Sequence, residues 1–213
     1  MLKIIRNLLV SGVSFFAAIG PAQAQRDIEQ PSYDVLKQSD GVELRRYAPH
    51  IVAEVTVEAG SMRQASSEGF RSLAGYIFGY NQGAEKIAMT APVTTQAQSE
   101  GTQIAMTAPV TTSEDKDGTY TIRFSMPSEW TMATLPKPKN DKVELKQIDT
   151  EKRVVYPLVG DRSGARLDEA QAKIDAFLKK EKLKAVSSTI IAGYDGPNVP
   201  TKNQRWEVMR IVS

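Results

Sequence analysis

The alternation of apolar and polar residues predicts most of the β-strands. Between residues 51 and 58 the apolar side chains recur at every second position, which places one face of a strand in the core and leaves the other polar. A shorter strand over 42–47 is opened by an Asp-Gly turn, and a third alternating segment runs over 120–126. Further along the chain, strands are predicted around 143–148, 153–158, 187–192 and 205–212.

Two segments instead have apolar residues at helical spacing. After Ser61, which stands three residues before Gln64 as in a capping box, the apolar positions are Met62, Phe70, Leu73, Tyr76 and Ile77. The second helix follows Ser163, its predicted cap, and its apolar face is Leu167, Ala170, Ile174, Phe177 and Leu178. Acidic residues near its start and lysines near its end suit the helix dipole.

A nine-residue sequence occurs twice, over 87–95 and 104–112, and predicts two strands of similar environment. Two copies are too few for a solenoid, which needs about three. With a proline-rich linker at 135–140, the order strand, strand, helix, strand, strand occurs in two halves, about 33–134 and 141–213. The pattern predicts an α+β fold, a pseudo-twofold (ββαββ)×2 arrangement in which an antiparallel, distorted barrel-like sheet carries two helices.

The N-terminus has the features of a secretory signal peptide. Lys3 and Arg6 precede an apolar run that ends at Gly20-Pro21, and Ala22-Gln23-Ala24 follows as a cleavage site. The run is shorter than the about 20 apolar residues of a membrane span, so we expect residues 1–24 to be removed and no stable membrane insertion afterwards. Residues 25–213 then form a single periplasmic or secreted domain.

Charge and cysteine content narrow the possible functions. The chain has 27 basic and 25 acidic residues and no cysteine. Removing Lys3 and Arg6 with the signal peptide leaves the two signs balanced, without the basic stripe that nucleic-acid binding needs. The absence of cysteine excludes disulfides and thiolate chemistry, so the fold depends on packing. Strand carboxylates such as Glu54, Glu144 and Glu207 are expected on exposed faces.

Several motifs together resemble the SOUL heme-binding family. They are Tyr33-Asp34-Val35-Leu36, Val42-Glu43-Leu44-Arg45-Arg46-Tyr47, the two Met-Thr-Ala-Pro-Val segments, Met126-Pro127-Ser128-Glu129-Trp130, Ala192-Gly193-Tyr194-Asp195-Gly196-Pro197 and Arg205-Trp206-Glu207-Val208. The match spans about Tyr33 to Ile211. The resemblance implies a distorted eight-stranded barrel-like sheet with two helices, heme or a related porphyrin as the ligand, and no established catalytic residues.

The resemblance also implies a heme groove beside the first helix and the Ala-Gly-Tyr-Asp turn. Carried over by position, the cofactor-binding residues on the helix are Arg63, Ser67, Phe70, Arg71, Ala74 and Phe78. Tyr194 and Trp206 are added because amphipathic rings often line the edge of a groove. The two arginines would meet the propionates. Ser67 and Ala74 stand where some relatives have a positive side chain and methionines. Core packing is the alternative for Phe70, Tyr194 and Trp206, and exposure to solvent is the alternative for the arginines.

No metal site is predicted, although heme iron takes histidine or methionine ligands among others. His50, the only histidine, lies in a turn and is the one candidate ligand. It is not the ligand proposed in a relative, which directly precedes the tyrosine, because Arg46 stands there. Met89 and Met106 occupy equivalent positions in the repeat, and we expect them to fill gaps in the core rather than to bind iron.

The favoured function is a binding protein that carries or buffers heme or a porphyrin. No nucleophile elbow, histidine cluster or phosphate loop indicates catalysis, so catalytic residues are not predicted. Two alternatives remain: a small-molecule hydrolase on a fold like that of multidrug-sensing regulators, and a protein-interaction module with incidental heme binding. A groove carboxylate with a raised pKa would favour the hydrolase. The oligomeric state is left open.

Overall fold

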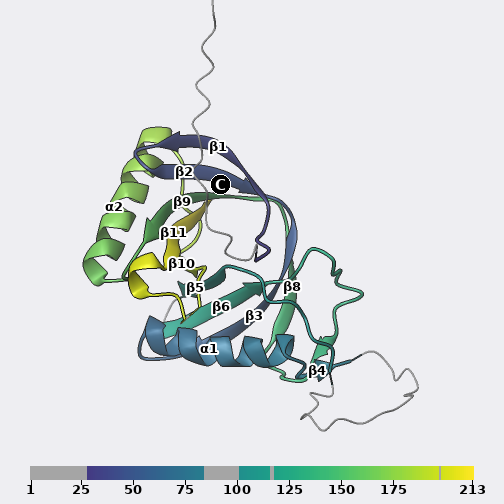
Figure 1. Cartoon of the computed structure of the whole chain (residues 1–213). Coiled ribbons are helices and arrows are strands. Elements are labelled where there is room, and N and C mark those ends of the chain that lie inside the picture. The colour runs from purple at the N-terminus through teal and green to yellow at the C-terminus, as the bar shows by residue number, and fades with distance from the viewer. Residues whose placement is uncertain (1–27, 84–100, 116–117, 197) are drawn as a thin grey trace, which may run out of the picture.

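A computed structural model describes residues 28–83, 101–115, 118–196 and 198–213. The main element is one antiparallel sheet of nine strands in the order β1-β2-β9-β11-β10-β5-β6-β3-β8 (Figure 1). Its strands are β1 (Tyr33–Ser39), β2 (Val42–Tyr47), β3 (His50–Glu58), β5 (Val110–Glu114), β6 (Thr119–Ser125), β8 (Glu144–Ile148), β9 (Glu151–Val159), β10 (Ile190–Gly193) and β11 (Arg205–Val212). A small second sheet pairs β4 (Asn81–Gln82) with β7 (Lys137–Pro138).

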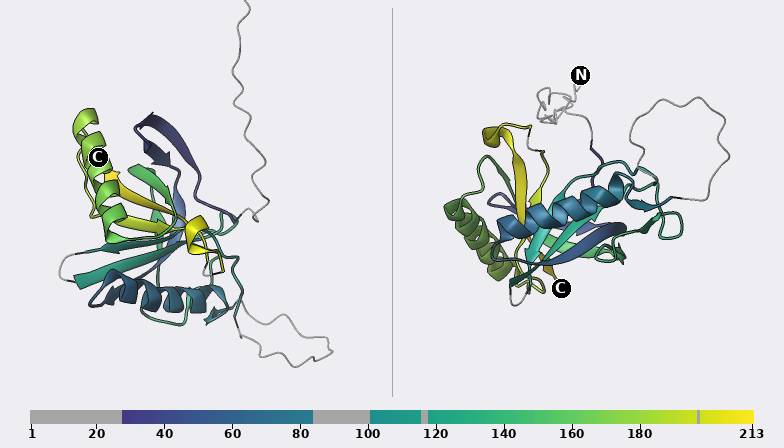
Figure 2. Two further views of the ribbon diagram at one scale, coloured as in Figure 1. Left: turned by 60° about the vertical axis from the view of Figure 1, so that its left-hand side comes forward. Right: turned by 90° about the horizontal axis from the view of Figure 1, so that it is seen from below.

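The sheet is curled into a half-barrel, and both helices lie on its outer face (Figures 1 and 2). Helix α1 (Met62–Ile77) packs on β3, β6 and β5, and helix α2 (Gly164–Glu181) packs on β9, β11 and β2. Each helix buries its own apolar cluster against the strands beneath it. A third cluster, Tyr47, Val155, Ile190, Ala192 and Met209, lies on the inner face of the curl.

The predicted α+β class and the twice-repeated order of elements are confirmed. The series β2, β3, α1, β5, β6 matches the series β8, β9, α2, β10, β11 along the chain. The sheet order shows that β2 pairs with β9 and β8 pairs with β3. Each half therefore places its first strand at the far side of the other half, and the two halves also join where β10 pairs with β5.

Alternation identified the strands well because the outer face of the sheet is covered by helices. Ile51, Ala53, Val55 and Val57 all point into the cluster under α1, as the pattern of β3 predicts. On the inner face of the sheet, the predicted exposure of two carboxylates is wrong. Glu54 and Glu207, expected to be exposed, are buried, and only Glu144 of the three predicted surface carboxylates is exposed. The inner face of a curled sheet is itself shielded, so its polar residues need partners within the protein.

Both helices occur where the apolar spacing predicts them. Ser61 is the N-cap of α1, and its side chain accepts a hydrogen bond from the backbone N–H of Gln64 at 3.3 Å. Ser163 is the N-cap of α2, but its side chain makes no capping hydrogen bond. At the other end of α2, Lys179 and Lys180 lie in the last turn, as the dipole argument predicts.

Some element boundaries differ from the prediction. In the second copy of the repeat, residues 104–109 are not a strand, and β5 begins only at Val110, after a cis peptide bond between Ala108 and Pro109. Ile104 and Ala108 instead use their backbone N–H groups to bond to Ile77 and Glu29. The predicted strand at 187–192 begins later, at Ile190. The edge strand β1 brings the main sheet to nine strands rather than eight.

Other predictions fall on residues that are not described. The signal peptide and the whole first copy of the repeat, with Met89, lie outside the described residues. Among the residues that are described, no helix is long and apolar enough to cross a membrane.

Candidate functional site

Helix α1 exposes the row of residues that the resemblance assigned to a heme groove. Phe70 is 40% exposed and Phe78 is 53% exposed. Arg63, Ser67 and Arg71 are exposed as well, and Ala74 is half-buried. The ring of Phe70 also packs edge-on against Phe124 of β6, with centroids 5.3 Å apart. These six residues, which we call the α1 row, recur at helical spacing along one side of α1.

The other two predicted groove residues make their contacts elsewhere. Trp206 is 1% exposed and belongs to the cluster beneath α2. The Tyr194 hydroxyl donates to the Glu207 carboxylate on the inner face of the sheet. The core-packing alternative therefore describes the surroundings of Trp206, and Tyr194 belongs to a polar network rather than to the α1 row.

The Ala-Gly-Tyr-Asp motif holds the turn between β10 and β11. The Asp195 carboxylate accepts hydrogen bonds from the backbone N–H of Arg205 at 2.6 Å and from the guanidinium of Arg205 at 2.8 Å. These bonds lower the pKa of Asp195. The guanidinium of Arg162 lies against Gly193, and a Cβ there, 2.6 Å from Nη2, would require this flexible side chain to shift. The motif thus has a structural explanation in this chain.

A polar network lies on the inner face of the sheet. The guanidinium of Arg45 donates to Glu43 at 2.6 Å, to Glu207 at 2.9 Å and to the hydroxyl of Tyr47 at 3.2 Å. Burial alone would lower the pKa of Arg45, but the charge of Glu207 and the contact with Tyr47 outweigh it and raise the pKa. For Tyr194, burial and then Glu207 both raise the pKa. The network keeps Arg45 charged and Tyr194 protonated.

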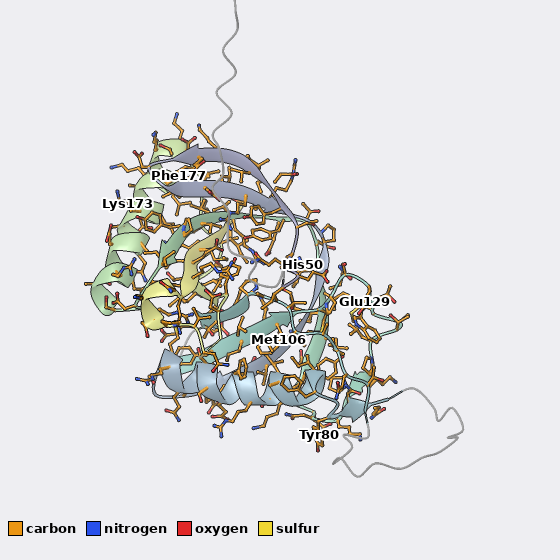
Figure 3. All side chains as sticks on the ribbon, viewed as in Figure 1. His50, Tyr80, Met106, Glu129, Lys173 and Phe177 are labelled. Atoms are coloured by element: carbon orange, nitrogen blue, oxygen red, sulfur yellow. The ribbon has the colours of Figure 1, made fainter. Side chains whose placement is uncertain are left out.

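A pocket of about 420 Å³ opens beside the start of β3. That volume is within the roughly 300–1,000 Å³ of small-molecule sites. Its walls come from the ends of several segments and include His50, Met126, Pro127, Trp130 and Met132. We call it the His50 pocket. In the view of Figure 3, His50 lies above Met106, and α1 runs below both.

The imidazole of His50 has a defined orientation. Its Nδ1 lies 2.9 Å from the carbonyl oxygen of Ala48. A carbonyl only accepts, so Nδ1 carries the proton and Nε2 keeps its lone pair. Among the described residues, nothing donates a hydrogen bond to Nε2. Burial lowers the pKa of His50, which favours this neutral form near pH 7.

Trp130 is part of the pocket wall, but its indole nitrogen is buried within the protein. Its Nε1 is buried and has no hydrogen-bond partner among the described residues, a state shared with Nε1 of Trp206 beneath α2. Buried N–H groups nearly always have a partner. Trp130, Met132 and Gln147 were not predicted as site residues, although Trp130 lies in the Met-Pro-Ser-Glu-Trp motif quoted for the resemblance. Only the folded chain shows that this motif faces His50.

The described part of the chain gives little support to a metal site or to a catalytic function. It contains no group of three or more His, Asp or Glu residues placed to hold a metal ion. Met106 is 48% exposed, so it does not fill a gap in the core as expected. Burial would raise the pKa of Glu54, but hydrogen bonds from Lys146 and Arg123 outweigh it and lower the pKa. Glu54 therefore does not supply the raised pKa that the hydrolase alternative needs.

These features define a class of protein: an α+β half-barrel with an open pocket, lined by apolar and polar side chains, of a size that suits a small molecule. The family profile described as SOUL heme-binding protein matches residues 28–101 and 94–211. The chain belongs to the SOUL heme-binding protein family, as the motifs predicted.

Known relatives agree with this assignment. The chain is 26% identical over 201 residues to heme-binding protein 2 of Mus musculus, covering 90% of this chain and 92% of the mouse protein. Two solved structures share the fold at low identity. A hydrolase from Listeria innocua has a TM-score of 0.51 at 13% identity, with 84% of this chain and 94% of that one covered. The C-terminal domain of EcmrR has a TM-score of 0.57 at 10% identity, with 85% and 98% covered.

Heme is the cofactor of this family, and the His50 pocket has side chains that suit it. A neutral imidazole nitrogen is a usual axial ligand of heme iron. Methionine, proline and tryptophan side chains offer apolar contacts for a macrocycle. The α1 row also supplies aromatic rings and arginines. The α1 row remains a prediction, and the His50 pocket is the second place to consider.

Proposed function

We propose that the chain binds heme or a related tetrapyrrole and acts as a periplasmic or secreted carrier or buffer. The observation that carries the proposal is the open pocket of about 420 Å³, whose walls combine apolar side chains with His50, a histidine that has one unpaired ring nitrogen. Membership of a heme-binding family supports the same ligand. Heme would supply an iron atom whose axial position a protein side chain can occupy.

Reversible binding follows from the composition of the chain. Covalent attachment of heme through a Cys-x-x-Cys-His motif needs cysteines, and the chain has none. A heme held only by apolar contacts, hydrogen bonds and one ligand bond can be released to an acceptor. Exchange of this kind is what a carrier or a buffer needs.

Titration and transfer test the proposal. Purified protein is titrated with ferric heme, ferrous heme and metal-free protoporphyrin while Soret absorbance and tryptophan quenching are recorded. We expect a single class of saturable sites for heme, and transfer of the bound heme to apomyoglobin. The Val159→Ala variant, altered at a 55% exposed residue of β9, serves as the control and should bind equally. Absence of saturable binding would exclude the proposal, and heme that cannot be transferred would exclude the carrier role.

One observation favours a second candidate, a protein-interaction surface. Phe78 and Tyr80, at the end of α1, are 53% and 59% exposed, and exposed aromatic groups are enriched at protein interfaces. This candidate predicts that α1 variants leave tetrapyrrole binding unchanged. It becomes the leading function if neither heme nor protoporphyrin gives saturable binding.

A further inference from the structure

We infer that His50 ligates heme iron through Nε2 in the His50 pocket, so that the chain binds iron-containing heme in preference to metal-free porphyrin. The inference rests on the proposed function and specifies its site and its ligand. It differs from the expectation from the resemblance, which places the macrocycle on the α1 row without an iron ligand.

The imidazole of His50 has the protonation pattern that a heme ligand needs. A heme ligand must present a lone pair, and the partner of the other ring nitrogen decides which nitrogen has it. Metal-binding histidines usually donate their second N–H to a carbonyl or carboxylate group. In His50, Nδ1 donates to the Ala48 carbonyl oxygen at 2.9 Å, and Nε2 is left for a ligand bond. The backbone carbonyl of His50 also accepts from the side chain of Gln147, another residue of the pocket wall.

The shape of the His50 pocket also suits a bound macrocycle. A concave site covers most of a bound ligand. The pocket has a volume of about 420 Å³, and its walls include the side chains of Met126, Met132 and Trp130, which can contact the apolar faces of a macrocycle.

Hydrogen bonds hold the walls of the pocket in place. Residues 29–32 line one side, where the carbonyl oxygen of Ser32 accepts from the backbone N–H of Ala48 at 3.0 Å. Glu29 accepts from the backbone N–H groups of Ala108 at 3.0 Å and Ser128 at 2.7 Å. Three separate segments are thereby fixed around His50 before any ligand binds. A preformed site loses less entropy on binding.

Charge sets the orientation of the ligand. Glu29 is the one carboxylate of the pocket wall, and the wall includes no lysine or arginine among the described residues. Two propionates would be repelled by Glu29 and would find no cation inside. A bound macrocycle would therefore have its apolar edge in the pocket, near His50, and its propionates in solvent.

Spectra of heme complexes test the inference, with the full protein and His50→Ala compared. The wild-type complex should show the Soret and electron paramagnetic resonance signature of a histidine-ligated ferric heme. His50→Ala should lose that signature and bind ferric heme at least about tenfold more weakly. Added imidazole should restore the signature, which shows that the variant is folded. Metal-free protoporphyrin should bind wild type and His50→Ala alike and more weakly than heme binds wild type.

Two further variants locate the macrocycle. Thr131→Trp places a large side chain at an exposed position of the pocket wall and should weaken both heme and protoporphyrin. Phe78→Ala in the α1 row should change neither. Saturable heme binding with an iron spectrum unchanged in His50→Ala, or weakened by Phe78→Ala instead, would overturn the inference but keep the proposed function. If no tetrapyrrole binds wild type, both fail.

Discussion

The side chain of Arg45 is only 4% exposed, yet it carries a charge into the inner face of the sheet. Three groups accept hydrogen bonds from it: Glu43, Glu207 and Tyr47. Its guanidinium also lies 4.3 Å from the centroid of the Tyr33 ring. Removing a partner from such a pair costs much more than breaking an exposed ion pair, because the remaining charge stays buried.

At this scale we predict that Glu207→Ala lowers the free energy of unfolding by about 3 kcal/mol, at the lower end of values for broken buried pairs because Glu43 remains. Urea denaturation followed by circular dichroism measures the change. Arg46→Ala, one residue further along β2, is the matched control, since it removes an exposed pair with Asp34 and should cost about 0–1 kcal/mol. Equal losses in the two variants would contradict the prediction.

The burial of single residues was the property that the sequence predicted least well. Alternation assigned Glu54 and Glu207 to the polar face of their strands, which is correct, and took that face to be exposed, which is wrong. The pattern reports which residues share a face but not whether the sheet curls over it. The orientation of the His50 ring likewise depends on the Ala48 carbonyl, a backbone contact that no side-chain pattern encodes.

Among the elements, helices and strands differed in how well they could be predicted. A helix closes its hydrogen bonds locally, so the cap at Ser61 and the apolar spacing were enough to locate α1. A strand also needs a neighbour. Residues 104–109 have the composition of a strand, but Ile104 and Ala108 bond instead to the end of α1 and to Glu29. Only Val110–Glu114 pairs in the sheet, because only that part lies beside β6 and β10.

The N-caps of the two helices give a prediction at the element scale. Ser61→Ala removes the hydrogen bond to Gln64 N–H and should lower the free energy of unfolding by about 1 kcal/mol. Ser163 occupies the same position in α2 without a side-chain capping bond, so Ser163→Ala should change it by less than about 0.5 kcal/mol. Guanidinium denaturation of the three proteins measures both. A larger loss for Ser163→Ala would show that the capping bond is not what distinguishes the sites.

The whole molecule should unfold as one unit, because the main sheet runs without interruption through both halves. Each half supplies one of the two tryptophans, Trp130 packed against the α1 cluster and Trp206 within the α2 cluster. Each tryptophan can be followed alone, Trp206 in the variant Trp130→Phe and Trp130 in the variant Trp206→Phe. We predict that in each variant the tryptophan fluorescence and the far-UV circular dichroism change at the same urea concentration. A fluorescence midpoint separated from the circular dichroism midpoint in either variant would mean that the halves unfold separately.

The exchange of first strands also bears on how the chain is made. Synthesis proceeds from the N-terminus, so β2 is made long before β9, the strand with which it pairs. In the same way, β3 is made before its partner β8. A nascent chain that stops at residue 140 holds three strands, β2, β3 and β5, that each lack a partner strand from the second half. Because non-local pairing of this kind slows folding and exposes strand edges to other chains, the unfinished protein is the form most in need of a chaperone.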